Sequence, residues 1–145
     1  MIDTRELKES RYLEEFSDSD LAELAAIGTA THWREGEIIF HEGSPAKNFF
    51  ILKKGTVLLC YPNGRSLPLK NGGHGIGWSS LVSPFRYTAT GICLTDATLI
   101  QFPGTELYSL IRMNAAFGHK LMAKIAKTIE ERKKYRTKGD RQEQM

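Results

Sequence analysis

The sequence is poor in the residues that build disulfide-linked or metal-linked proteins. Its 145 residues contain 2 cysteines, Cys60 and Cys93, and 4 histidines. Both cysteines lie in apolar, strand-like stretches, which favours reduced core thiols of a cytoplasmic protein over a disulfide or a metal pair. The histidines are scattered and form no His-x-His pair, whereas a metal enzyme on a β-barrel needs clustered His and carboxylate ligands. They are His32, His41, His74 and His119. A hydroxyl nucleophile also lacks an evident His–Asp partner set. We therefore predict no metal, no cofactor and no enzymatic activity, against the alternative of a cupin-like enzyme.

Long hydrophobic runs are also missing. The longest apolar stretches, 49–52 and 57–61, are far shorter than the roughly 20 residues of a membrane-spanning helix. The N-terminus, Met1–Glu6, is charged and lacks the apolar core of a signal peptide. The length fits one domain with a single core. The sequence thus predicts one globular domain with no membrane association.

Charge is unevenly distributed along the chain, although the net charge is only +3. The first twenty residues are mainly acidic, and the segment from Lys120 onward is mainly basic. A basic segment can contact nucleic acid or acidic proteins, or it can be a solvated helix face. Apart from Tyr135 the segment lacks the interleaved aromatic residues that stack on bases. We favour the solvated face and expect no sequence-specific DNA binding.

Residues 1–28 are predicted to form N-terminal helices. Residues 3–16 carry a sparse helical stripe, and Ser17 or Ser19 can cap a second helix with Asp20 in its first turn. That helix is expected to end at Gly28.

Residues 29–103 have the pattern of an all-β sandwich or barrel. Glycines and prolines recur between short β-rich runs. Lys54-Gly55 predicts a tight hairpin, and 62–64 predicts another. Residues 49–52 are apolar on both faces, which is typical of a strand covered on each side. The expected strands are Thr29–Trp33, Glu37–His41, Asn48–Leu52, Thr56–Tyr61, Ser66–Leu69, Thr88–Leu94 and Ala97–Phe102.

Helices return in residues 104–136. A short helix is expected at 106–113, and Asn114 can cap a longer helix that runs to about Tyr135. Residues 137–145 are polar and are predicted to be disordered. The long helix has an apolar stripe that can pack on the sheet, on a twin helix, or on both. This stripe, at about 115–135, is the predicted homodimer interface: Phe117, Leu121, Met122, Ile125 and Ile129.

The glycine-rich stretch 71–90 is the centre of the functional prediction. Its clustered glycines precede a short apolar piece, Trp78–Val82, which is followed by Pro84 and the start of a strand at Tyr87. Glycine-rich backbone before a helix start can hold an anion, because free N–H groups and the helix dipole both favour negative charge. Glycine clusters also serve simple tight turns.

Together, these spacings resemble the cyclic nucleotide-binding domain, as found in the effector domain of catabolite-activator-type (Crp/Fnr) bacterial transcription regulators. The resemblance covers about residues 21–129 and implies an antiparallel jelly roll with flanking helices and a long C-terminal helix that pairs with its twin. The segments that carry it are Gly36–Gly43, Phe50–Val57, Gly73–Gly77, Thr88–Thr90 and Leu94–Ala97.

Two positions depart from the pattern that this resemblance implies. Trp78 stands where nucleotide-binding members have a ribose-binding Glu, and Tyr87 stands where they have a phosphate-binding Arg. Arg86 is one residue early, and alternation along a strand directs it to the opposite face. The two aromatics either line a repurposed pocket or plug it, and we favour the plug. The candidate ligand-binding residues are Gly75, Gly77, Trp78, Ser79, Ser80, Arg86, Tyr87 and Thr88.

The resulting functional prediction is a non-enzymatic, cytoplasmic regulatory module with a degenerate nucleotide site. Its ligand would be a cyclic nucleotide or another small anion, and the alternative is a true cAMP or cGMP receptor that uses Arg86 for the phosphate. Only about ten polar residues follow Tyr135, too few for the helix-turn-helix domain of the related regulators. We therefore expect a homodimer that acts on an unidentified protein partner.

Overall fold

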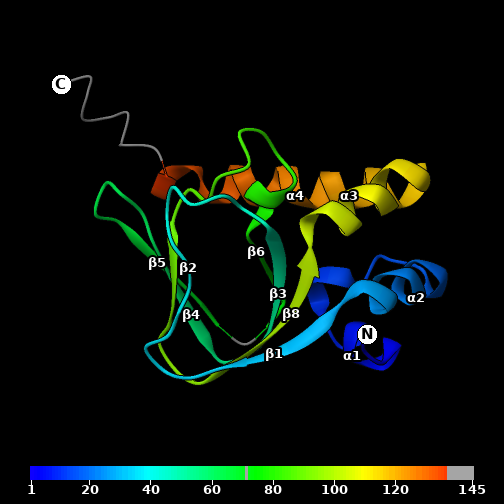
Figure 1. Cartoon of the computed structure of the whole chain (residues 1–145), viewed down its shortest axis with the longest axis horizontal. Helices are drawn as coiled ribbons and strands as arrows, with labels where there is room; N and C mark the ends of the chain where they lie inside the picture. The colour runs from blue at the N-terminus through cyan, green and yellow to red at the C-terminus, as the bar shows by residue number, and fades with distance from the viewer. Residues whose placement is uncertain (71, 137–145) are drawn as a thin grey trace.

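A computed structural model of the chain describes residues 1–70 and 72–136. Asn71 and the tail at 137–145, which was predicted to be disordered, lie outside the described residues. Two four-stranded antiparallel sheets face each other, the N-terminal helices pack outside one sheet, and the last helix lies across one end of both (Figure 1). This arrangement confirms the predicted β-rich jelly roll with flanking helices.

The strands are short, and apart from the pair β4 and β5, consecutive strands lie in different sheets. The first sheet has the order β1 (Thr29–Trp33), β8 (Ala97–Pro103), β3 (Asn48–Lys54) and β6 (His74–Ile76). The second has the order β2 (Ile38–Phe40), β7 (Thr90–Cys93), β4 (Thr56–Cys60) and β5 (Ser66–Lys70). Seven strands match the predicted ones within a few residues. Strand β6 was not predicted, because it lies inside the glycine-rich stretch.

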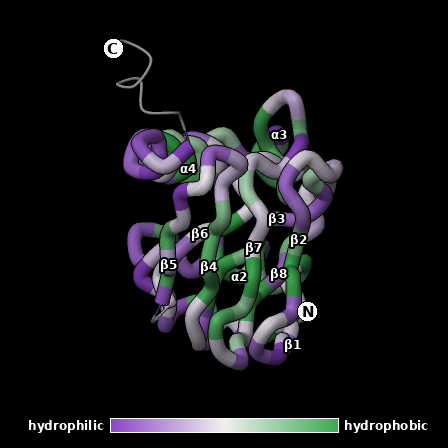
Figure 2. Tube along the Cα trace, turned by 90° about the vertical axis from the view of Figure 1, so that its left-hand side faces the viewer, coloured by the Kyte–Doolittle hydropathy of each residue, from purple (hydrophilic) through white to green (hydrophobic). Residues whose placement is uncertain are grey.

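Strand β3 explains why an uninterrupted apolar run is needed. Phe49 and Ile51 belong to the core under the helices, whereas Phe50 and Leu52 belong to the core between the sheets. All four side chains are at most 3% exposed. Successive side chains of a strand point to opposite faces, so a strand that is covered on both sides must be apolar throughout. Figure 2 shows the same tendency across the molecule: hydrophobic residues concentrate along the strands and hydrophilic residues concentrate in the loops.

The turn at Lys54-Gly55 differs from the prediction. Strands β3 and β4 lie in different sheets, so this turn is a corner between the sheets and the predicted hairpin is wrong. Gly55 has φ +96, and a Cβ there would lie 2.4 Å from the Asp96 carbonyl oxygen. The Lys54-Gly55 sequence correctly predicted a turn, but it could not show that β4 would pair with strands of the other sheet. The hairpin at 62–64 is confirmed, because β4 and β5 pair directly.

The N-terminal segment forms α1 (Thr4–Lys8), a 3-10 turn η1 (Arg11–Leu13) and α2 (Asp18–Ile27). Ser17 caps α2 through a reciprocal capping box with Asp20, with N···O distances of 3.1 and 3.3 Å. The helix ends at Gly28 as predicted, although the backbone there is extended. Glycine is required for space, because a Cβ would lie 2.9 Å from the Phe102 ring.

The C-terminal part contains η2 (Trp78–Ser80), α3 (Gly104–Met113) and α4 (Ala115–Arg136). Asn114 caps α4 as predicted, since its Oδ1 accepts from Phe117 N at 3.1 Å. Phe117, Leu121 and Ile125 are at most 2% exposed and pack in the same core as the N-terminal helices. These three residues of the predicted dimer interface therefore have almost no surface left for a second copy, while Met122 and Ile129 are half-buried. The homodimer itself stays a prediction.

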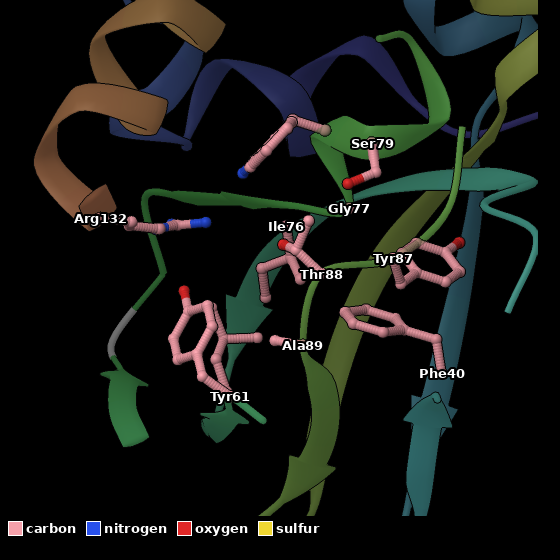
Figure 3. A pocket seen from close by; sticks show the side chains of 11 residues that line it. Phe40, Tyr61, Ile76, Gly77, Ser79, Tyr87, Thr88, Ala89 and Arg132 are labelled. Carbon is pink, nitrogen blue, oxygen red and sulfur yellow. The ribbon is translucent and has the colours of Figure 1, made fainter. Parts of the chain in front are cut away.

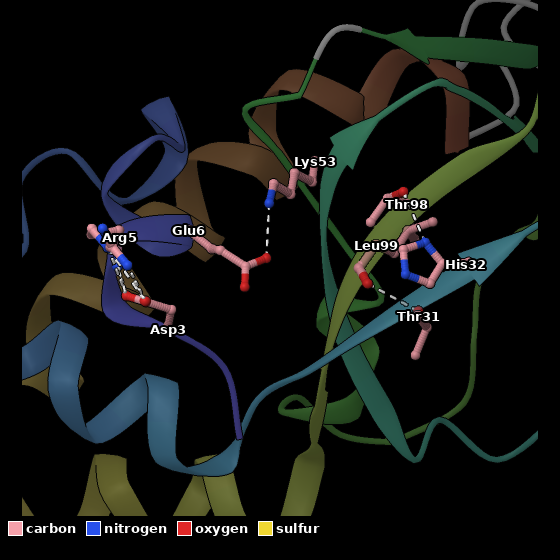
Figure 4. Close-up of polar contacts among 8 residues, drawn as sticks. All are labelled: Asp3, Arg5, Glu6, Thr31, His32, Lys53, Thr98 and Leu99. Atoms are coloured by element: carbon pink, nitrogen blue, oxygen red, sulfur yellow. Dashed lines mark hydrogen bonds and ion pairs between the residues drawn. The ribbon is translucent and has the colours of Figure 1, made fainter.

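The uneven charge of the sequence is partly neutralised inside the molecule. Lys120 lies 3.4 Å from Asp20, and Lys124 lies 3.3 Å from Glu15. A third pair, Lys53–Glu6 at 2.8 Å, joins α1 to β3 (Figure 4). The acidic N-terminal helices thus sit against the basic α4, which favours their association. Within the two described ranges, every helix is too short or too polar to cross a bilayer.

Candidate ligand pocket

A small cavity lies between the sheets, at the end that is covered by η2 and α4 (Figure 3). Its volume is about 20 Å³, and a single water needs about 10–15 Å³ of such space. The cavity can therefore hold about one water and no nucleotide. Its lining residues are Phe40, Leu59, Tyr61, Ile76, Gly77, Trp78, Ser79, Tyr87, Thr88, Ala89 and Arg132.

Tyr87 occupies much of the space in this region. Its ring stacks on Phe40 with a centroid distance of 4.1 Å and an interplanar angle of 16°. Its hydroxyl donates to Asn48 O at 2.9 Å and accepts from Asn48 N at 3.1 Å. Burial raises the pKa of the Tyr87 hydroxyl, so it stays a neutral donor. Two hydrogen bonds and a stacked ring hold this side chain as a fixed part of the wall.

The turn from β6 into η2 forms another wall. Gly77 has φ +84, and a Cβ there would lie 2.8 Å from Asn48 O. Only glycine fits this left-handed, crowded position without strain. The Ser80 hydroxyl donates to Gly77 O at 2.9 Å, which closes the turn on itself.

Arg132 enters the cavity from α4 and was not among the predicted site residues. Figure 3 shows its guanidinium pointing toward Ile76 and Thr88, above the Tyr61 ring. Arg132 is 7% exposed, and the Tyr61 side chain beneath it is 6% exposed. Burial lowers the pKa of the Arg132 guanidinium. Within residues 1–70 and 72–136 the guanidinium has no ion pair and no hydrogen bond. A buried charge without a partner is costly in free energy.

The end of α4 is fastened over the cavity by contacts from two other elements. Arg136 lies over the Trp78 ring, 5.6 Å from its centroid. In the β4–β5 hairpin, the Asn63 amide donates to Tyr135 O at 2.9 Å and the Arg65 guanidinium donates to Lys134 O. These donors satisfy carbonyls at a helix C-terminus, where cations are also favoured by the dipole. The helix end and the pocket are therefore mechanically connected.

The predicted ligand residues fall into two groups. Five of them line the cavity: Gly77, Trp78, Ser79, Tyr87 and Thr88. Gly75, Ser80 and Arg86 do not. Gly75 faces Tyr12 on the other side of β6, where a Cβ would lie 2.6 Å from the Tyr12 ring. Ser80 is turned toward α3, since it lies against Gly104.

Arg86 is exposed, and its Nη1 donates to Gly43 O at 2.8 Å. Arg86 therefore lies outside the pocket, although it precedes β7 and forms only an isolated bridge with Pro45, so strand alternation is not the reason.

Six lining residues were missed because their signals are not local: Phe40, Leu59, Tyr61, Ile76, Ala89 and Arg132. Phe40 and Tyr61 read as ordinary strand residues. Arg132 read as part of a solvated charged face. Arg132 follows Thr128 by four residues and Ile125 by seven, which places it on the buried face of α4. That periodicity was the available signal.

The described residues contain no group of three or more His, Cys, Asp or Glu side chains that could hold a metal ion. Cys60 and Cys93 are both free thiols. The polar groups of the pocket are hydroxyls, an indole and a guanidinium, which suit hydrogen bonding to an anion.

Comparison with known proteins agrees with this fold. The sequence pattern of the cyclic nucleotide-binding domain matches residues 30–114. A crystal structure of a candidate cyclic nucleotide-binding protein from Geobacter metallireducens GS-15 is 28% identical, covers 91% of this chain and 98% of that one, and has a TM-score of 0.81. The N-terminal domain of a transcriptional regulator from Streptomyces coelicolor A3(2) is 25% identical, with 92% and 99% covered and a TM-score of 0.67.

Glutaminase 1 of Bradyrhizobium diazoefficiens is 28% identical over 130 residues, which make up 90% of this chain and 21% of that protein. This chain thus corresponds to a small part of that relative. The family match spans more than half of the 145 residues, and the regulator domain confirms the resemblance to bacterial effector domains. The chain belongs to the cyclic nucleotide-binding domain family.

Proposed function

We propose that the chain is a non-enzymatic regulatory module whose nucleotide pocket is closed to cAMP and cGMP. The observation that carries this proposal is the 20 Å³ cavity, with Tyr87 fastened inside it by two hydrogen bonds. A nucleotide could enter only after that side chain and Arg132 had moved. Two free thiols and the lack of a spanning helix among the described residues fit our assignment to the cytoplasm.

The side chains that would bind the phosphate and the ribose of a nucleotide are also missing from the pocket. A phosphate without a bidentate arginine loses charge-assisted hydrogen bonds of about 1.5–3 kcal/mol. The ribose loses an acceptor worth about 1–2 kcal/mol, because Trp78 replaces the acid. Together these losses weaken binding by about two to three decades. The alternative, phosphate binding by Arg86, requires that this exposed side chain leave Gly43 O and cross to the inner face.

The output of the module is proposed to run through α4. The helix supplies Arg132 to the pocket and is held at its end by the β4–β5 hairpin and Trp78. Any change in the pocket therefore acts first on the position of α4. A related domain occupies 21% of a glutaminase, which supports a role beside a catalytic partner, in the same chain or in another.

A thermal-shift experiment tests the closed pocket. Ligand at a hundred times its dissociation constant stabilises a protein by about 2.7 kcal/mol, which is readily measured. We expect no shift of the melting temperature with cAMP or cGMP at millimolar concentration. A saturable shift that Arg86→Ala abolishes would refute the proposal and establish the alternative.

A variant that is expected to gain cAMP binding tests the same proposal from the other direction. Trp78→Glu combined with Tyr87→Arg restores the two groups that nucleotide-binding relatives are expected to carry, and it removes the ring that fills the pocket. We expect this double variant to bind cAMP at least tenfold more tightly than the parent chain. Equal and measurable binding by both proteins would show that the two aromatics do not close the site.

A further inference from the structure

A second cavity lies next to the nucleotide-type pocket, and Arg132 lines both. It has a volume of about 150 Å³ and is enclosed by η1, the approach to β6 and the second half of α4. One water needs about 10–15 Å³ of such space, so this cavity accommodates a ligand of several atoms. Its lining residues are Arg11, Tyr12, Gly73, His74, Gly75, Lys124, Lys127, Thr128, Glu131 and Arg132.

The wall of this cavity is strongly basic. Four of the lining residues are arginine or lysine, and Glu131 is the one carboxylate among them. Lys124 is paired with Glu15 at 3.3 Å. The charges that remain come from Arg11, Lys127 and Arg132, on two elements that are far apart in sequence. Like charges brought together repel each other, and a bound anion would remove that repulsion.

Two buried polar side chains of this wall lack partners. Arg132 is 7% exposed and, within residues 1–70 and 72–136, has neither an ion pair nor a hydrogen bond. Tyr12 is also 7% exposed, and its hydroxyl is buried without a hydrogen-bond partner in the same ranges. The Thr128 hydroxyl lies nearby and lowers the pKa of Tyr12, but it donates its own proton to Lys124 O at 3.0 Å and so cannot donate to Tyr12. Buried polar groups are nearly always hydrogen-bonded, so a ligand in this cavity would supply partners for both side chains.

The glycines of the approach to β6 create the space in which these side chains meet. A Cβ at Gly75 would lie 2.8 Å from Tyr12 Oη, and a Cβ at Gly73 would lie 3.2 Å from Arg11 Nε. Both side chains therefore rest directly on the backbone of the glycine-rich stretch. Burial raises the pKa of Tyr12, which keeps its hydroxyl protonated and able to donate.

We propose that this cavity binds a small oxyanion of the size of phosphate, held by Arg11, Lys127, Arg132 and the Tyr12 hydroxyl. Guanidinium groups suit oxyanions because their donors match the geometry of two oxygens. Side chains of η1 and α4 line the cavity, so an anion in it would join the N-terminal segment to the C-terminal helix. Arg132 lines both cavities, so the anion also acts on one wall of the nucleotide-type pocket.

Isothermal titration calorimetry with inorganic phosphate tests this site, at constant ionic strength set with chloride. Arg11 and Lys127 are both exposed, so Arg11→Ala and Lys127→Ala leave the fold intact. We expect the parent chain to bind one phosphate, and each variant to bind it at least about tenfold more weakly. Arg112→Ala is the matched control, because it removes one exposed positive charge on α3, outside the cavity, and it should bind like the parent.

Glycerol 3-phosphate in a parallel titration distinguishes two sources of the oxyanion. Tighter binding of the ester identifies a phosphorylated small molecule, and binding of inorganic phosphate alone identifies the free ion. The absence of saturable binding of either in the millimolar range overturns the proposal, as does equal binding by Arg11→Ala, Lys127→Ala and the parent. Neither result bears on the closed nucleotide pocket, which is tested separately with cAMP and cGMP.

Discussion

At Gly77, both the backbone conformation and the packing of the pocket wall require a glycine. Its φ is +84, and an added Cβ would lie 2.8 Å from Asn48 O. A side chain at such a φ costs about 1–2 kcal/mol, and the clash adds to that cost. We expect Gly77→Ala to lower the free energy of unfolding by at least about 2 kcal/mol, as measured by urea denaturation.

Gly64 provides the control for this prediction. It also has a positive φ, +91, but an added Cβ would meet nothing within 4 Å. Gly64→Ala should therefore show the conformational cost alone, about 1–2 kcal/mol. Equal losses in the two variants would mean that the contact with Asn48 O relaxes freely and that the turn is not tightly packed.

His74 should make stability depend on pH. Burial lowers the pKa of His74, and the positive charges of Arg132 and Arg11 lower it further, against a hydrogen bond to the Lys70 backbone and the charge of Glu131. In the unfolded chain a histidine titrates near 6.5, so below that pH the unfolded state binds a proton that the folded state resists. Stability should therefore fall as the pH drops below about 6.5.

Denaturation midpoints between about pH 7.5 and 5.5 check this expectation. His74→Gln should flatten the profile in that window, whereas His119→Gln, at an exposed position on α4, should leave it unchanged. An unchanged slope in His74→Gln would assign the pH dependence to other groups.

At the scale of elements, the N-terminus of α2 gives a direct comparison of two serines. The sequence allowed Ser17 or Ser19 as the cap, and the structure places Ser17 in a capping box with Asp20. Replacing a capping serine by alanine costs about 1 kcal/mol. We expect Ser17→Ala to lower the unfolding free energy by that amount and Ser19→Ala to change it by a few tenths at most. The reverse order would contradict the assigned cap.

The elements that the sequence predicted are those with local signals. The cap of α4 at Asn114 and the apolar β3 follow from short-range rules, and both are confirmed. Strand β6 has only His74, Gly75 and Ile76, with a glycine at its centre, because Tyr12 from η1 packs against that backbone. The reason for the glycine lies more than sixty residues away in the chain, so no window around β6 could have disclosed a strand.

For the whole molecule, some features of the site could be read from the sequence and others depend on how the elements pack. The substitution of acid and guanidinium by Trp78 and Tyr87 was visible in the sequence, and both residues line the pocket. The burial of Arg132 was not visible, because it depends on how α4 lies across both sheets. The acidic N-terminus and the basic α4 likewise looked like separate charged surfaces, yet Lys120 and Lys124 pair with Asp20 and Glu15.

The same packing changes where a second copy could bind. Leu121 is buried within one chain, so Leu121→Ala should act on folding and cost about 2–5 kcal/mol. Met122 and Ile129 are half-buried, and Ala126 between them is exposed. Their spacing of four and three residues places them on one face of α4, which we propose as the contact in the predicted homodimer.

Sedimentation at micromolar concentration separates the two faces of α4. We expect the parent chain to sediment as a dimer and Ala126→Glu to sediment as a monomer with an unchanged unfolding midpoint, because the new charge would be buried without a partner only in the dimer. Leu121→Ala should stay dimeric while its unfolding midpoint falls. A monomeric parent chain would refute the homodimer. If Leu121→Ala became monomeric without loss of stability, the dimer interface would instead lie at Phe117, Leu121 and Ile125.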